Sequence, residues 1–137
     1  MPKYFKLEEA NRMLPLLRRI VQDIVGAHGQ LLQKVEEYRS PSMELDLSGE
    51  RRRELEIELQ ELTDRVNGYV GELEGLGVEF KGFEEGLVDF HATLDGRPVF
   101  LCWKLGEESI EWWHEEDAGY AGRQRLPAQV QGTGGGR

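Results

Sequence analysis

The sequence predicts an α+β fold, in which a long antiparallel two-helix hairpin is followed by a small antiparallel β-meander of three or four strands. Two observations predict it. Apolar residues recur at alternating steps of three and four through residues 7–38 and again through 55–76, which is the spacing of packed amphipathic helices. After Gly77 the pattern changes to strand-forming residues on both sides of Asp95-Gly96, a signature of a tight hairpin turn.

A single domain is expected over residues 1–126, because a chain of 137 residues suits one hydrophobic core. We assign residues 7–76 to the helical hairpin and residues 78–123 to the β-meander. Residues 127–137 contain few apolar side chains and end in a glycine-rich run, so we expect them to form a disordered tail.

The first helix should span residues 7–38. Pro15 lies inside it, lacks a backbone donor and crowds the carbonyl of Asn11, so we expect a kink there or a break into a short first helix. Residues 39–47 contain a proline and two serines and should reverse the chain. Ser48 is the expected N-cap of the second helix.

One helical hairpin leaves part of each apolar face exposed, and the β-meander is long enough to cover only one end. We therefore expect a coiled-coil-like homodimer, most simply four helices with two-fold symmetry. The apolar positions that predict it are Leu7, Ala10, Leu14, Leu17, Val21, Ile24, His28, Leu31, Val35 and Tyr38, followed by Leu55, Leu59, Leu62, Val66, Tyr69, Leu73 and Leu76.

A two-residue turn at Asp95-Gly96 fixes the register of the two strands that flank it and places Asp89 opposite Cys102. One face is then apolar and should pack on the helices, and a slip of one residue would exchange the two faces. The apolar face consists of Val88, Phe90, Ala92, Val99, Leu101 and Trp103. The other face carries Asp89, His91, Thr93, Cys102 and Lys104.

A second reversal at residues 106–109 would bring Trp103 opposite Trp112, and His114 opposite Leu101 on the helix-facing side. A buried imidazole needs a polar partner, and Asp117 is the first choice. Any pocket should then open between the meander and the start of the first helix, with Trp112 and Arg123 at its rim.

Composition excludes several classes of partner. The formal net charge of −9 repels phosphate backbones, so we expect no nucleic-acid partner. The sequence has no apolar run long enough to span a bilayer and no signal peptide, so we expect no membrane partner and a cytoplasmic location. The single cysteine cannot form an internal disulfide, which agrees with that location.

Four blocks of sequence carry a family resemblance: YFKLEEANRMLPLL at residues 4–17, GLVDFHATLDG at 86–96, LCWKLGE at 101–107 and WHEEDAGYAGR at 113–123. In this order they resemble the bacterial and archaeal family known as domain of unknown function 2203, over essentially everything up to Leu126. The family pattern commonly has a proline after the Val-Asp-Phe sequence, where this chain has His91, so His91 is a poor candidate for a shared role. The resemblance supports the fold and implies no activity.

His114, Glu115 and Asp117 form a candidate site for a divalent metal, because imidazole together with carboxylates suits zinc, iron or manganese. Successive strand residues point to opposite faces, so His114 and Glu115 ligate one ion only if the strand has ended. The spaced zinc signatures HExxH and paired CxxC are absent from the sequence. The alternative is a structural His114, hydrogen-bonded at the sheet edge.

Asp89 and Cys102 form a second candidate pair. The carboxylate should raise the pKa of the thiol and make it a poor nucleophile, and the alternative role for Cys102 is that of a small buried residue. Arg123 follows a run of small residues and can clamp a carboxylate or phosphate in two-pronged fashion. The alternative is a tight turn in which Arg123 pairs with a local acid.

Two classes of function remain. The favoured one is a small dimeric interaction or small-ligand-binding module that uses the aromatic meander as its contact surface, with an unknown protein or small molecule as partner. The other is a metal-dependent or acid–base enzyme centred on His114 with Asp89, Glu115 or Asp117; the sequence assigns no catalytic residue. The residues of the predicted ligand or contact surface are Asp89, Cys102, Trp103, Trp112, Trp113, His114, Asp117 and Arg123.

Overall fold

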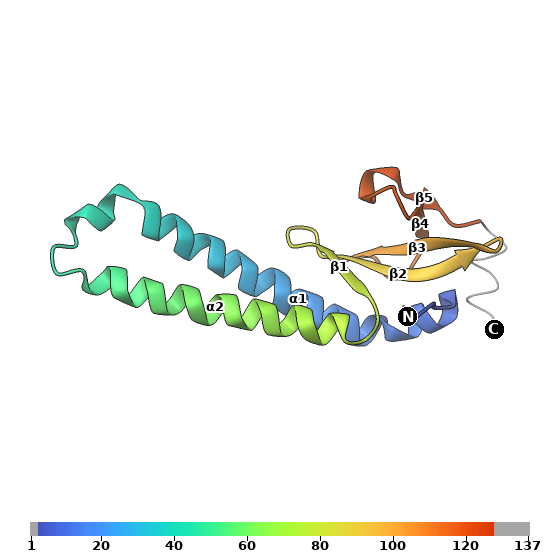
Figure 1. Cartoon of the computed structure of the whole chain (residues 1–137), viewed down its shortest axis with the longest axis horizontal. Helices are drawn as coiled ribbons and strands as arrows, with labels where there is room; N and C mark the ends of the chain where they lie inside the picture. The colour runs from blue at the N-terminus through green and yellow to red at the C-terminus, as the bar shows by residue number, and fades with distance from the viewer. Residues whose placement is uncertain (1–2, 128–137) are drawn as a thin grey trace.

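The computed structural model describes residues 3–127, which form a long helical hairpin with a sheet packed at one end (Figure 1). Helix α1 (Leu7–Arg39) and helix α2 (Glu50–Glu74) are joined through a short 3-10 helix, η1 (Pro41–Leu45). The later elements are β1 (Glu79–Gly82), β2 (Leu87–Leu94), β3 (Arg97–Lys104), β4 (Trp112–Glu115), the 3-10 helix η2 (Tyr120–Gly122) and β5 (Gln124–Arg125). The α+β prediction is confirmed, but the antiparallel sheet has five strands, in the order β1-β2-β3-β4-β5, where three or four were predicted. Apart from Pro127, the predicted disordered tail lies outside the described residues.

Helix α1 is continuous through Pro15, so of the two predicted alternatives, a kink or a break, the break is wrong. An interior proline costs about 3 kcal/mol. The neighbouring Leu14 and Leu17 are buried in the core, and burying each leucine contributes about 1.5–3 kcal/mol. Packing against the sheet therefore outweighs the lost backbone hydrogen bond.

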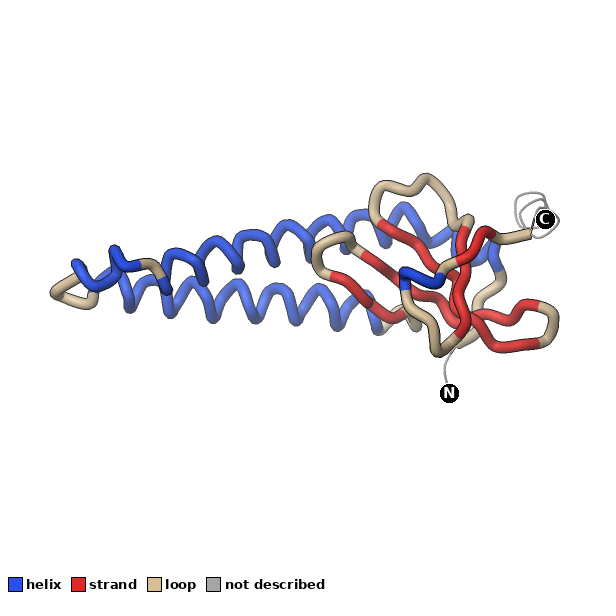
Figure 2. Tube along the Cα trace, turned by 90° about the horizontal axis from the view of Figure 1, so that it is seen from above, coloured by secondary structure: helices blue, strands red, loops and turns tan. Residues whose placement is uncertain are grey.

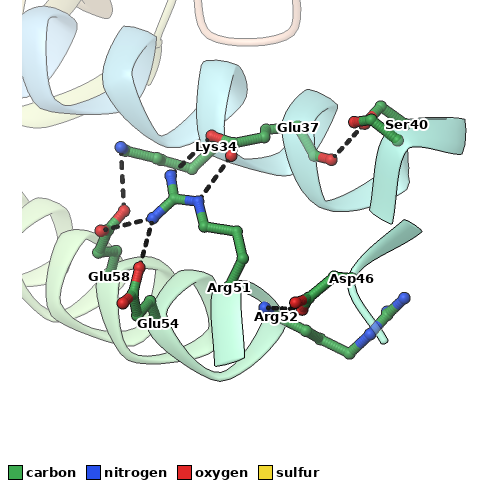
Figure 3. Close-up of polar contacts among 9 residues, drawn as sticks. Lys34, Glu37, Ser40, Asp46, Arg51, Arg52, Glu54 and Glu58 are labelled. Atoms are coloured by element: carbon green, nitrogen blue, oxygen red, sulfur yellow. Dashed lines mark hydrogen bonds and ion pairs between the residues drawn. The ribbon is translucent and has the colours of Figure 1, made fainter. Parts of the chain in front are cut away.

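Ion pairs link the two helices at the end of the hairpin far from the sheet (Figure 3). Arg51 on α2 donates to both carboxylate oxygens of Glu37 on α1, at 2.8 and 2.9 Å, and Lys34 pairs with Glu58 at 2.9 Å. The hydrogen bonds from Arg51 hold the pKa of Glu37 below its ordinary value.

The N-terminus of α2 differs from the prediction. Gly49, with a φ of 72°, is the residue that precedes the helix, and Ser48 lies one position earlier. A carboxylate oxygen of Asp46 accepts the backbone N–H of Arg52 at 3.0 Å, so an acidic side chain satisfies one of the free donors in the first turn.

The register of β2 with β3 is the one that the Asp95-Gly96 turn predicts. Asp95 and Gly96 have φ values of 53° and 79°, and Leu94 pairs with Arg97. Asp89 pairs with Cys102, as expected. The predicted apolar face is buried, and it packs with α1 in the hydrophobic core.

The register of β3 with β4 differs from the prediction by one residue, because Leu101 pairs with Trp113 and not with His114. In the connecting loop Ile110 is buried, and its backbone N–H donates to the side-chain oxygen of Asn11 on α1 at 2.8 Å. Ile110 therefore belongs to the core and not to the β3–β4 ladder. The one-residue shift places Trp113 on the helix-facing side and His114 on the outer face.

The outer face of the sheet is covered in part by the segment between β4 and β5. This segment holds η2 and lies on the side of the sheet away from α1 (Figures 1 and 2). The sheet therefore has a helix on one face and a short loop segment on part of the other.

Candidate functional site

Three chemically active side chains from three neighbouring strands meet on the outer face of the sheet: Asp89 of β2, Cys102 of β3 and His114 of β4. A carboxylate oxygen, the sulfur and a ring nitrogen all lie within 4.8 Å of one another. All three residues are buried, and Asp89 and His114 are the two polar or charged residues that are buried within residues 3–127. Strand pairing brings them together, because Asp89 lies directly opposite Cys102, and His114 lies opposite Phe100, two residues along β3 from Cys102 and on the same face.

The hydrogen bonds of His114 fix its ring. Nδ1 lies 2.8 Å from the carbonyl oxygen of Glu115, and since a carbonyl only accepts, Nδ1 must carry the hydrogen. Nε2 lies 3.1 Å from Oδ1 of Asp89. The neutral ring therefore presents the Nε2 lone pair to the carboxyl group, and a hydrogen bond between these two atoms needs a proton on one of them.

The surroundings shift the acidity of the two other groups. Burial raises the pKa of Asp89 above its ordinary value, and the hydrogen bond to His114 opposes this rise. Burial, together with the nearby Asp89 carboxylate, raises the pKa of Cys102 to about 11. Cys102 is therefore a protonated, unreactive thiol at neutral pH, as the sequence predicts for a thiol beside a carboxylate.

Arg123 holds the covering segment in place. Its guanidinium lies 4.4 Å from the ring centre of Trp112 and 4.6 Å from that of Tyr120. The same group pairs with the carboxylate of Glu107 at 2.7 Å, and one of its nitrogens lies 3.9 Å from the sulfur of Cys102. Arg123 thus joins the β3–β4 loop, the η2 segment and the buried cysteine.

A pocket of about 260 Å³ opens over the three side chains. Asp89, Cys102 and His114 form part of its lining. The remaining lining residues are Lys81, Leu87, Phe100, Glu116, Ala118, Gly119 and Tyr120, which come from β1, the start of β2, β3 and the covering segment. The pocket therefore combines a buried polar group of three residues with apolar side walls.

Residues 3–126 match the sequence profile of a family described as "Uncharacterized conserved protein (DUF2203)". The chain belongs to the DUF2203 family. The match includes both helices, all five strands and every residue of the pocket. No curated protein and no solved structure matches the chain.

Neither of the long helices, nor any other helix in residues 3–127, has the length and apolar run needed to cross a bilayer.

The position predicted for His114 is wrong. It lies on the outer face of the sheet and not beside Leu101 on the helix-facing side, and its carboxylate partner is Asp89 and not Asp117. The pocket over His114 correspondingly opens away from α1. Trp112 and Arg123 contact each other beside this site, but neither lines the pocket. The cause is the one-residue difference in the register of β4.

The predicted metal group of His114, Glu115 and Asp117 is not assembled. Glu115 points to the other face of β4, where both of its carboxylate oxygens accept from Arg97 at 2.8 and 3.0 Å, and Asp117 is exposed. Within residues 3–127 the group of side chains suited to a metal combines His114 with Asp89 and Cys102 instead.

Two of the three tryptophans lie in the core and offer no contact surface. Trp103 is fully buried and donates its ring N–H to the carbonyl of Glu107 at 3.0 Å, and Trp113 is buried beside it in the same core. Trp112 is half-buried on the outer face, under Arg123 and Arg125. Of the three tryptophans predicted for the contact surface, Trp112 alone is thus left partly exposed.

Sequence reasoning missed the roles of Lys81, Glu107 and Tyr120. Lys81 belongs to the short edge strand β1, whose pairing with β2 has an irregularity that period-two alternation does not reveal. Glu107 lies in the β3–β4 loop and Tyr120 in η2, and neither segment has a periodic pattern. The alternative in which Arg123 pairs with a local acid is confirmed, and that acid is Glu107.

Proposed function

We propose that this protein binds a small molecule in the pocket over β2, β3 and β4. The ligand directs a polar group toward Asp89 and His114 and lays an apolar part against Leu87 and Phe100. The observation that carries this proposal is the position of the two buried polar residues of the described chain, which lie side by side at one pocket.

A purely structural role explains this arrangement less well. Burying a polar or ionisable group is unfavourable unless it is fully paired, and a well-packed apolar pair is often equally stable or more stable. Here the costly pair adjoins an open pocket, and the pKa of Asp89 is raised by burial. Clefts that combine apolar walls with a few converging polar groups and shifted pKa values are typical of ligand sites.

The size of the pocket supports a small ligand. Pockets for drug-sized molecules measure about 300–1,000 Å³, and this one measures about 260 Å³. Its charged side chains are of opposite sign, Lys81 and Glu116, so the walls favour neither a strongly anionic nor a strongly cationic ligand. We therefore expect a small, mostly apolar molecule that carries one hydrogen-bonding head group.

A panel of short-chain and aromatic acids, amides and alcohols tests this proposal by ligand-observed NMR. The blocking variant is Gly119→Trp, because Gly119 lines the pocket, has an extended φ of −108°, and has open space where a side chain would begin. The matched control is Gly68→Trp on α2, another glycine with open space at that position.

We expect at least one compound class to bind the unmodified protein and the Gly68→Trp variant with a Kd of about 1 mM or tighter, and to lose binding in Gly119→Trp. Binding that persists in Gly119→Trp, or a panel that yields no binder, would contradict the proposal.

Three predictions from the sequence remain open beside this proposal. The enzyme hypothesis retains His114 and Asp89 and loses Glu115 and Asp117 as their partners. The homodimer and the cytoplasmic location stay predictions. The exposed Leu32 on α1 and Ile57 on α2 support the homodimer, because both are large apolar side chains left in solvent on the hairpin.

A further inference from the structure

We propose that Asp89, Cys102 and His114 bind one divalent transition metal ion of the zinc class, with a coordination position open toward the pocket. This inference goes beyond small-molecule binding, because it assigns a resident metal to the chain. It rests on the three side chains themselves and stands whether or not a small molecule binds above them.

The spacing of the three donor atoms fits a metal site. Zinc lies about 2.0–2.3 Å from nitrogen, oxygen and sulfur ligands, so tetrahedral ligands lie about 3.3–3.7 Å from one another. The donor atoms here lie within 4.8 Å of one another, and Nε2 of His114 lies 3.1 Å from Oδ1 of Asp89. Small side-chain rotations would bring the three donor atoms to tetrahedral ligand separations. Each ligand comes from a different strand of one sheet.

The outer contacts of His114 and Cys102 are those that metal ligands need. A metal-bound histidine usually donates its other ring nitrogen to a carbonyl or carboxylate, and Nδ1 of His114 donates to the carbonyl of Glu115. Arg123 places a nitrogen 3.9 Å from the sulfur of Cys102, and the Glu107 carboxylate holds that guanidinium at 2.7 Å. The ring of His114 is therefore already oriented with its Nε2 lone pair toward the proposed metal position. The guanidinium of Arg123 is a cationic donor that faces the sulfur of Cys102.

Charge balance also favours a divalent ion. A carboxylate, a thiolate and a neutral imidazole carry two negative charges, which one divalent cation neutralises in this buried position. When the metal binds, the thiol proton and the proton shared by Nε2 and Oδ1 leave to solvent, so the three ligand atoms turn from each other to the ion.

The donor set selects the metal class. Thiolate favours zinc and cuprous ions, imidazole favours zinc, copper, iron and nickel, and carboxylate favours harder ions, so zinc is the divalent ion best suited to this combination. Three protein ligands with a fourth position open are typical of zinc sites that also bind water or a substrate. Here that position would face the pocket, which Asp89, Cys102 and His114 all line.

The full-length protein, stripped of metal by a chelator, is titrated with cobalt(II) and then with zinc(II). Cobalt bound by a thiolate gives a sulfur-to-cobalt charge-transfer band in the near ultraviolet, together with visible bands typical of tetrahedral geometry. The chain has one cysteine, so such a band identifies Cys102 without any variant. Elemental analysis of the protein as purified gives the metal content independently.

The test variants are Cys102→Ala and Asp89→Asn, and His91→Gln is the matched control. His91 lies on the same strand as Asp89, and its Nε2 contacts the carboxylate of Glu79 at 2.6 Å, but it is not one of the three ligands. We expect each test variant to weaken zinc binding by more than the 10–100-fold that outer-shell changes cause. We expect His91→Gln to bind zinc as the unmodified protein does.

One cobalt per chain with a charge-transfer band that disappears in Cys102→Ala and persists in His91→Gln would support the site. The absence of that band in the unmodified protein, or equal zinc affinity in Cys102→Ala, would overturn it. These titrations use metal alone, and the small-molecule panel is repeated with and without metal. Metal binding without any small-molecule binder would contradict only the ligand proposal, and a binder without metal uptake would contradict only the metal site.

Discussion

Replacing Asn11 by alanine tests how α1 fixes the loop beside the site. The side-chain oxygen of Asn11 accepts the backbone N–H of Ile110 at 2.8 Å, across 99 positions of sequence. Ile110 is 2% exposed, so this N–H has little access to water once its partner is removed. The same loop contains Glu107, which holds Arg123 beside Cys102.

The expected change in the free energy of unfolding on Asn11→Ala is the balance of two opposing effects. A buried backbone donor left without a partner costs about 1–3 kcal/mol. Alanine is a better helix former than asparagine by up to about 0.7 kcal/mol, which offsets part of this loss. We therefore expect Asn11→Ala to lower the free energy of unfolding by about 0.3–2.3 kcal/mol.

Urea unfolding, followed by circular dichroism at one fixed protein concentration, measures this difference, with an unchanged m-value as the sign of two-state behaviour. Asn67→Ala is the control, because Asn67 is an exposed asparagine within α2 and reports helix propensity alone. Asn11→Asp keeps an acceptor oxygen and should retain most of the stability. Equal stabilisation by Asn11→Ala and Asn67→Ala would show that the hydrogen bond from Ile110 to Asn11 does not stabilise the fold.

Two further predictions concern the helical hairpin. Arg51→Met should lower the melting temperature at neutral pH, because it removes the hydrogen bonds to Glu37. The pKa of Glu37 is lowered in the folded protein, so the stability that these bonds contribute is present above about pH 4.5 and is lost as the pH falls through the folded pKa. The melting temperatures of the two proteins should therefore converge toward pH 3. A difference that is unchanged at pH 3 would contradict this account. If the hairpin forms the predicted homodimer, Leu32→Asp combined with Ile57→Asp should halve the mass measured by light scattering without loss of helicity, because both side chains are exposed in the single chain. A monomeric mass for the unmodified protein at micromolar concentration would refute the dimer.

The parts of the fold that follow from local patterns were predictable from the sequence. The helices follow from apolar spacing, and the β2–β3 register follows from Asp95-Gly96, which also places Asp89 opposite Cys102. The β3–β4 register was not predictable in this way. The loop between these strands has no comparable turn signature. The residue at which β4 begins depends on a long-range contact of Ile110 with α1.

The candidate site was therefore only half predictable. The turn predicts the pairing of Asp89 with Cys102, whereas the predicted β4 register places His114 on the wrong face, because a one-residue difference exchanges the faces of a strand. The continuity of α1 through Pro15 has a similar cause, since packing against the sheet overrides a local preference that the sequence alone displays.

The length of the hairpin beyond the sheet has a consequence for how the molecule opens. Helix α1 has 33 residues and is about 50 Å long, yet its buried residues end at Ala27. The portion from there to η1 is stabilised by ion pairs and by its contacts with α2, so it should exchange its amide hydrogens sooner than the strands that carry Asp89, Cys102 and His114. Local opening at this end leaves the pocket intact, and η1 is accordingly the position where an inserted tag or a fluorescent label should leave the site undisturbed.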